Sequence, residues 1–383
     1  MSSINLDMVN RLVLQKQHLT EESMISDVVQ IVRDIGGLHA TNSETPYLSL
    51  LARSRGFTRE HLDEEQYVKR NLGKIRCMRG TIYILAKEMI PTAYAATRKM
   101  LEKSSRRYVE YRGVSAEKYN ELSKLILGLL EGKEMTASEI RRILGTRLDV
   151  SAILYLMCDQ ALLIRSKPDR YSLFLEHFPD LDLSGIDEEK AVTQLVLQYL
   201  SSFGPVTEND IAWWTGLGKT KILQALSNIQ RRTVRIMVSH LEGDFILLNL
   251  DQDEVIVATR THMRRTINLL PCLDPYLMGY RERERYVRPE YYNRIFDRSG
   301  NVTSTILLDG RVIGVWDFEK PEPRVKIYLF EKVGRSVFGE ICFKAQEIGK
   351  FIAGKEVPIR ECSSMITLTQ RTAGAVMSPL KGC

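Results

Sequence analysis

Two side chains able to act together on a substrate lie one residue apart near the start of the chain. His39 and Thr41 follow a glycine pair at 36–37, which is typical of a helix end because glycine adopts left-handed backbone conformations easily. If the backbone is extended there, alternate side chains point the same way, so the imidazole and the hydroxyl would share one face. An imidazole titrates near neutral pH and could orient or deprotonate a water molecule that attacks an electrophilic carbon. Glu44 and Asp34 are alternative carboxylates nearby, and a structural His39 bonded to a backbone carbonyl is the plainer interpretation.

Two predicted helices flank this short polar segment, residues 38–42, which forms the His39 strip. The first runs from about Met24 to the glycine pair, with apolar residues at helical spacing. The second begins at Ser43 or Thr45, either of which could cap it, and has Pro46 in its first turn. The rest of the chain would then bring a substrate to the strip.

The composition is that of an ordinary soluble globular protein, since 44% of the 383 residues are hydrophobic and 27% are charged. This length allows roughly two to four compact units. No apolar run approaches the ~18 residues of a membrane span, and the N-terminus lacks the pattern of a signal peptide, so we expect a cytoplasmic protein. The six cysteines are scattered, which favours reduced thiols, and the six histidines show no ligand spacing, so no metal site is expected.

Basic residues gather in two segments, although the formal net charge is only +6. Such clusters are typical of proteins that bind a polyanion, because local charge density matters more than the sum. The alternative for each cluster is a solvated helix face. The candidate contacts in segments 98–112 and 219–235 are Arg98, Lys99, Arg106, Arg107, Lys219, Lys221, Arg231 and Arg232.

A basic hairpin is predicted over Arg76–Leu85. Arg79 would lie at its tip beside Gly80. A basic hairpin tip can enter a nucleic-acid groove or stack against a displaced base, and Arg76 is a further candidate contact. A solvated turn without a binding role is equally compatible with the pattern.

A helix–turn–helix–hairpin pattern recurs along the chain. Its clearest copy has helices over about 188–202, 208–216 and 219–229, with Thr207 as a cap, and two strands around a turn at Glu242-Gly243. This order of elements is the winged-helix arrangement. We therefore predict three winged-helix units and a C-terminal region, with the boundaries 1–113, 114–185, 186–255 and 256–383.

The second copy has its own local signals. A helix is predicted over about 116–131, and Thr136 with Glu139 forms a capping box for the next helix. A third helix follows at about 150–160, with two strands around a turn at 167–169.

The C-terminal region alternates like strands over 298–331, with Asp309-Gly310 as a hairpin turn. A helix is predicted over 335–353 and a last strand over 365–371, and the final residues SPLKGC are expected to be frayed. The predicted fold class is α+β, ending in a small β-rich barrel or sheet with one helix.

Four segments, in this order, resemble the AlkZ/YcaQ family of winged-helix DNA glycosylases. The resemblance covers nearly the whole chain and rests on GLHATNSETPYLSLLAR, RCMRGTIYIL, LLPCLDPYLMGYRER and TILLDGRVIGVW. It implies three tandem winged helices and a C-terminal β-barrel, curved around a DNA-binding cleft. It also implies removal of bulky or crosslinked N-alkylated purines, and some members protect producers of DNA-alkylating toxins from their own products. The remaining candidates for the cleft or its scaffold are Asn42, Glu44, Asp274, Tyr276, Tyr280 and Arg281.

The chain departs from this family at the strip itself. The best-understood members carry Gln-x-Gln or Gln-x-Asp where this chain has His39-Ala40-Thr41. The resemblance therefore implies a catalytic pair at His39 and Thr41, in which His39 would take the water and Thr41 would fix it or contact the sugar. A cationic N-alkylpurine is already a good leaving group, so modest electrostatic help could suffice. The different pair could instead indicate that the chain acts on a different lesion, or on no lesion.

The predicted function is a monofunctional DNA glycosylase that uses no metal, cofactor or Schiff-base lysine. Its partner would be double-stranded DNA with alkylated or crosslinked bases, and we expect a nucleoid-associated monomer without membrane contact. The main alternative is a non-catalytic winged-helix DNA-binding protein, either a regulator or a lesion-sequestering protein. A third hypothesis is an enzyme acting on a small molecule in the cleft.

Overall fold

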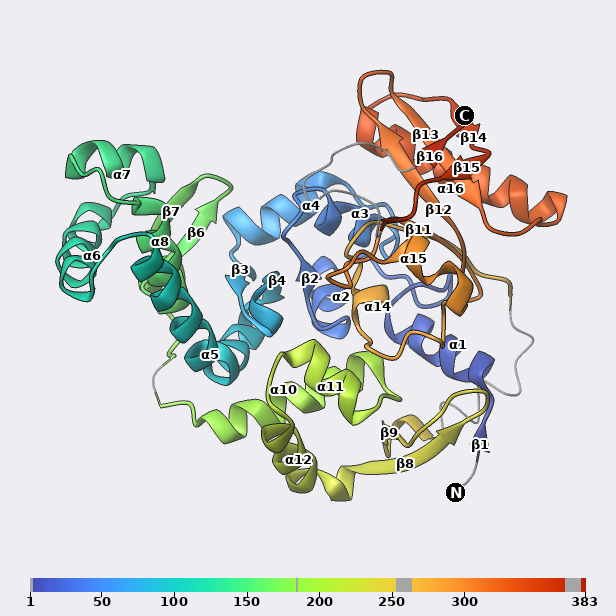
Figure 1. Cartoon of the computed structure of the whole chain (residues 1–383), viewed down its shortest axis with the longest axis horizontal. Helices are drawn as coiled ribbons and strands as arrows, with labels where there is room; N and C mark the ends of the chain where they lie inside the picture. The colour runs from blue at the N-terminus through green and yellow to red at the C-terminus, as the bar shows by residue number, and fades with distance from the viewer. Residues whose placement is uncertain (1–2, 184, 253–263, 369–379) are drawn as a thin grey trace. The chain divides into compact units, whose positions relative to one another are not determined.

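The chain divides into two compact units that each gather distant stretches of sequence. The computed structural model describes residues 3–183, 185–252, 264–368 and 380–383. Unit 1 comprises Met1–Thr58, Gln198–Trp214 and Ile229–Cys383, and unit 2 comprises Arg59–Leu197 and Thr215–Asn228. Both contain helices and strands, so the fold is mixed α+β (Figure 1). The four-part division at 113, 185 and 255 stays a prediction.

The largest sheet lies in unit 1 and has five strands. Neighbouring strands pair antiparallel up to β13, and β14 pairs parallel to β13. Asp309 and Gly310 both have positive φ, of 50° and 80°, which confirms the predicted hairpin turn. The predicted barrel is not confirmed, because no closed sheet is found among the described residues. The strands in their spatial order are β10 (Ile267–Leu270), β11 (Thr305–Leu308), β12 (Arg311–Glu319), β13 (Arg324–Leu329) and β14 (Ile359–Glu361).

Helix α16 (Arg335–Ala353) packs against this sheet, within the bounds that the sequence predicts. Val337, Ile341 and Ala345 recur at helical spacing and join one buried apolar cluster with Ile306 and Trp316 of the sheet. Burial of this stripe is what fixes the helix on the sheet.

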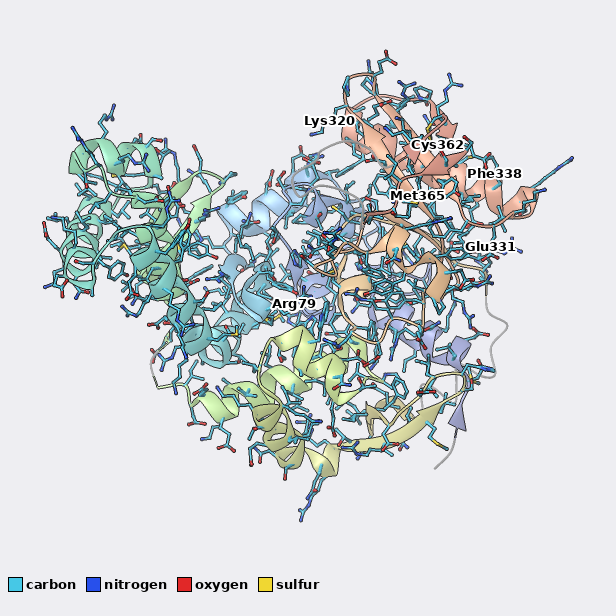
Figure 2. The ribbon with its side chains drawn as sticks, viewed as in Figure 1. Arg79, Lys320, Glu331, Phe338, Cys362 and Met365 are labelled. Atoms are coloured by element: carbon cyan, nitrogen blue, oxygen red, sulfur yellow. A yellow bond between two sulfur atoms is a disulfide. The ribbon has the colours of Figure 1, made fainter. Side chains whose placement is uncertain are left out.

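The end of the chain differs from its prediction. Leu380–Lys381 forms strand β16, which pairs antiparallel with β15 (Ser364–Met365), so these two residues are not frayed. The same register continues outward to Cys362 and Cys383, which form a disulfide, so the expectation of reduced thiols is wrong for this pair (Figure 2). Long-range strand pairing brought these cysteines together, and cysteine spacing carried no signal of it. The predicted strand over 365–371 lies partly outside the described residues.

A second sheet of unit 1 joins the N-terminus to a distant hairpin. β8 (Thr233–Val238) and β9 (Phe245–Leu248) pair antiparallel, which confirms the predicted hairpin, and β1 (Ser3–Ile4) pairs parallel with β8 (Figure 1). The helices of the N-terminal stretch are α1 (Leu6–Lys16), α2 (Val28–Asp34) and α3 (Thr45–Leu51), with strand β2 (Leu38–His39) between the last two. Two short helices, α14 (Pro275–Met278) and α15 (Tyr292–Ile295), follow β10.

Unit 2 contains two β-hairpins and most of the long helices. Thr136 caps α7 by a complete capping box with Glu139, as predicted. The strands are β3 (Leu72–Arg76), β4 (Ile82–Ala86), β5 (Met135–Thr136), β6 (Leu163–Lys167) and β7 (Arg170–Leu173). The helices are α4 (Arg59–Asp63), α5 (Ile90–Tyr111), α6 (Ala116–Leu130), α7 (Ala137–Leu144), α8 (Val150–Asp159), α9 (Phe174–His177) and α12 (Lys219–Asn228).

Helices α10 (Glu188–Phe203) and α11 (Glu208–Thr215) contribute residues to both units. At the start of α11, Thr207 and Asp210 exchange hydrogen bonds between side chain and backbone, which confirms the predicted cap. Among the described residues, no helix is long and apolar enough to span a membrane.

Candidate functional site

The strip around His39 begins where α2 ends. Gly36 and Gly37 have φ of 73° and 101°, and the Gly37 N–H donates to the Val32 carbonyl at 2.9 Å. This left-handed ending confirms the predicted helix end and turns the chain directly into β2. His39 is the last residue of that strand and is only 3% exposed, between Leu38 and Ala40, which are also buried.

Thr41 lies in a bend beyond the strand and is exposed. The alternation expected of extended backbone therefore stops at His39, and the imidazole and the hydroxyl differ in exposure. Asn42, rather than Ser43 or Thr45, organises the start of α3. Its side-chain oxygen accepts hydrogen bonds from the Glu44 and Thr45 N–H groups at 2.8 and 3.3 Å.

A cavity of about 850 Å³ in unit 1 opens beside the connection between β2 and α3. Asn42 and Glu44 line it, whereas His39 and Thr41 are not among the described residues at its wall. Glu319 on the wall lies 2.8 Å from the Lys326 ammonium and also pairs with Arg324, and these hydrogen bonds lower the pKa of Glu319. The basic residues of the wall are Lys320, Arg324, Lys326 and Lys381 (Lys320 is labelled in Figure 2).

The segment containing Asp274 is a scaffold for α3. Asp274 is fully buried, and its carboxylate accepts hydrogen bonds from the Arg53 guanidinium at 2.7 and 2.8 Å and from the Ser49 hydroxyl at 2.8 Å. The same carboxylate caps α14 by accepting the Tyr276 N–H at 3.0 Å. Arg53, two residues beyond the end of α3, was not predicted as part of this site, and its spacing of four residues after Ser49 was the only signal.

The two predicted tyrosines of that segment are buried as well. Tyr276 donates its hydroxyl to the Gly310 carbonyl at 2.9 Å, and Tyr280 donates to the Phe203 carbonyl at 2.8 Å. Arg285, which sequence reasoning missed, is 1% exposed, and its guanidinium lies 3.9 Å from the centre of the Tyr280 ring. Arg281 is exposed, and its N–H donates to the Asp210 carboxylate at 2.8 Å. Both hydroxyls thus donate to backbone carbonyls within unit 1, and a scaffold role for Tyr276 and Tyr280 stays a prediction.

In unit 2, the predicted basic hairpin is confirmed as β3 and β4, joined by a tight turn over Met78–Gly80. Arg79 lies at the tip with a left-handed φ of 54° (labelled in Figure 2). Arg76 is half-buried and pairs with the buried carboxylate of Asp159 at 2.5 Å. Its guanidinium therefore stabilises the hairpin through a contact within unit 2.

The basic candidates of unit 2 differ in their partners. Lys99 and Lys221 both pair with Glu188, and the hydrogen bonds from Lys221 and then Lys99 lower the pKa of that carboxyl group. Arg98 is half-buried with its guanidinium 5.9 Å from the centre of the Tyr94 ring. The exposed candidates of this unit are Lys99, Arg106, Arg107, Lys219 and Lys221, and Arg231 and Arg232 are exposed in unit 1.

No group of three or more His, Cys, Asp or Glu side chains is arranged to hold a metal ion within the part of the chain that the structure describes. The four cysteines outside the disulfide are free. Cys77 is buried, and its burial raises the pKa of its thiol to about 12, so it carries no thiolate at neutral pH.

A family model described as "DNA glycosylase AlkZ-like" matches residues 32–350. A protein of Streptomyces sahachiroi described as an interstrand DNA cross-link repair glycosylase is 24% identical over 333 residues, which cover 81% of this chain and 86% of that protein. The solved structure of the Streptomyces sahachiroi DNA glycosylase AlkZ is similar with a TM-score of 0.76 and 20% identity. That match covers 94% of this chain and 100% of the other, and at this identity it shows a shared fold.

Proposed function

The chain belongs to the DNA glycosylase AlkZ-like family, and from that membership we propose that it hydrolyses the N-glycosidic bond of N-alkylated or crosslinked purines in duplex DNA. The family match over residues 32–350 is the observation that carries the proposal, because it includes the His39 strip, the Arg79 hairpin and most of the scaffold. The relative named for interstrand cross-link repair supports crosslinked DNA as a substrate. In this proposal the enzyme is monofunctional, acts as a monomer and uses water as the nucleophile.

Three winged-helix units and a C-terminal β-rich domain are the architecture of this proposal. The units correspond to 1–113, 114–185 and 186–255, and the recurring helix–helix–hairpin order of the described elements supports them. The exposed basic side chains on α5 and α12 and in the turn at 230–232 would neutralise DNA phosphates. Much of the affinity would then depend on salt concentration.

His39 and Thr41 are the proposed catalytic pair. The imidazole would orient or deprotonate the attacking water, and the Thr41 hydroxyl would fix that water or contact the sugar. Because the departing N-alkylpurine already carries positive charge, the site has to supply only modest stabilisation to the sugar cation. Thr41 is exposed to solvent.

The burial of His39 sets a condition on this chemistry. Its side chain is 3% exposed, so bound DNA would have to open this part of the chain before water and a nucleoside could reach the imidazole. The same burial favours a second candidate function, a non-catalytic DNA-binding protein that sequesters lesions or regulates transcription. Such a protein would bind duplex DNA and release no base.

The experiment that separates the two uses defined duplexes carrying an N7-alkylated guanine or an interstrand crosslink. An enzyme releases the free modified base from the mono-alkylated duplex and unhooks the strands of the crosslinked one, leaving an abasic site in each, which chromatography and strand cleavage detect. A sequestering protein protects the lesion without either product.

A further inference from the structure

The tip of the β3–β4 hairpin is held in an unfavourable backbone conformation. Arg79 and Gly80 are both left-handed, with φ of 54° and 68°. The tip closes through two hydrogen-bonded turns, from the Gly80 N–H to the Cys77 carbonyl at 2.9 Å and from the Thr81 N–H to the Met78 carbonyl at 3.0 Å. The Cys77 N–H also donates across the hairpin to the Thr81 carbonyl at 3.0 Å. A residue with a Cβ disfavours left-handed backbone, so the surroundings must hold Arg79 in place.

Arg76 holds the tip from one side. Its Nε donates to the Gly80 carbonyl at 2.8 Å, so the guanidinium grips the turn directly. The other end of the guanidinium is fixed by two helices, because Nη1 donates to the Ser105 hydroxyl of α5 at 2.9 Å and to the Asp159 carboxylate of α8 at 2.5 Å. Ser105 and Asp159 are 1% and 3% exposed and hydrogen-bonded to each other. A buried carboxylate paired in this way stays fixed because breaking the pair leaves an uncompensated charge.

Gly216 supports the tip from another direction. A Cβ at this position would lie 2.9 Å from the Arg79 Cα and 3.0 Å from the Arg79 nitrogen, closer than real side chains come to backbone. The turn between α11 and α12 therefore meets the backbone of Arg79 and leaves no room for a larger residue.

We propose that Asp159, acting through Arg76, and Gly216 are positioning residues that fix the backbone of the hairpin tip, from which the half-buried Arg79 side chain would reach DNA. This inference rests on the proposed function, and it gives the proposed enzyme a rigid hairpin tip for contacting DNA. A tip that is already ordered pays no further conformational entropy when DNA binds. It also explains why Arg76, predicted from sequence to contact DNA, is turned to an internal role.

The first test measures the tip itself, without any substrate. Hydrogen exchange of the Gly80 and Thr81 amides is compared in wild type, Asp159→Asn and Gly216→Ala, and exchange at least about tenfold faster is expected in both variants.

Gly113→Ala is the matched control for Gly216→Ala, because Gly113 also has positive φ, of 80°, but has nothing within 4 Å of its Cβ position. Glu134→Gln is the control for Asp159→Asn, because it breaks a 3.0 Å ion pair with Lys167 in the other hairpin of unit 2. Unchanged exchange at the tip in both variants would overturn the proposal.

The second test links the tip to function by a double-variant cycle with Arg79→Ala. Asp159→Asn should slow single-turnover base release about tenfold when Arg79 is present and less than about twofold in the Arg79→Ala background. Equal losses in the two backgrounds would mean that Asp159 does not act through the tip, and would overturn the inference. If wild type releases no base, the proposed function fails, and duplex affinity in the same cycle then decides the role of the tip. If Asp159→Asn does not fold, Ser105→Ala replaces it with the same expected outcomes.

Discussion

Arg53 and Asp274, which are 221 residues apart in the sequence, form a two-pronged ion pair with both side chains fully buried. The pair joins the turn that follows α3 to the start of α14. It fixes the strip's second helix onto the C-terminal half of unit 1. Asp274, in the segment LLPCLDPYLMGYRER, thus forms this junction.

Removing one partner of this pair should destabilise unit 1 strongly. Asp274→Ala leaves the Arg53 charge buried without its partner and removes the cap of α14, so we expect a loss of about 3–5 kcal/mol in the free energy of unfolding. Urea denaturation measures it as a lower midpoint. Asp7→Ala is the control, because the Asp7–Arg311 pair is exposed at 2.8 Å and should contribute only about 0–1 kcal/mol. Comparable losses in the two variants would contradict the role given to Asp274.

His177 should make unit 2 sensitive to acid. Burial, followed by the charge of Arg70, lowers the pKa of His177 from 6.5 to about 4, so the folded chain holds the neutral ring. The contribution of His177 to the free energy of unfolding is complete above pH 6.5. It decreases by up to roughly 3 kcal/mol as the pH falls towards 4. We expect His177→Gln to lose less stability than wild type across this window, which thermal unfolding at a series of pH values would measure. If the stability of wild type and of His177→Gln fell equally with pH, the predicted acid sensitivity could not be assigned to His177.

Glu188 should weaken DNA binding by occupying two lysines. Its carboxylate pairs with Lys99 at 2.6 Å and with Lys221, and both lysines lie on the surface proposed to meet phosphates. Glu188→Gln is expected to raise duplex affinity and to steepen the slope of log K against log salt by about 1–2. Arg107→Ser should reduce that slope by about 1, because no ion pair of the described residues engages Arg107. Fluorescence anisotropy at several salt concentrations gives both slopes, and an unchanged slope in both variants would remove this surface from DNA binding.

Local signals in the sequence predicted local structure well. The Thr136 capping box, the Asp309-Gly310 turn and the bounds of α16 all follow from residues within a few positions of one another. Such features are determined by backbone preferences and by one apolar face, which the sequence displays directly.

Contacts between distant segments could not be predicted in this way. The pairing of β1 with β8 and the Cys362–Cys383 disulfide each depend on how separate segments pack. The burial of His39 belongs to the same class, because periodicity cannot tell a two-residue buried strand from an exposed one. Asp274 was singled out for its setting, but its partner Arg53 emerges only from the fold.

The most direct test of the account is base release by wild type, His39→Ala and His39→Gln from a duplex carrying a single N7-alkylated guanine. We predict release by wild type, a loss of about 100-fold or more in His39→Ala, and partial activity in His39→Gln, whose amide can still position water. His240→Ala, which alters an exposed histidine, should match wild type. Equal rates in wild type and His39→Ala, or no release by wild type from any alkylated duplex, would contradict the central claim.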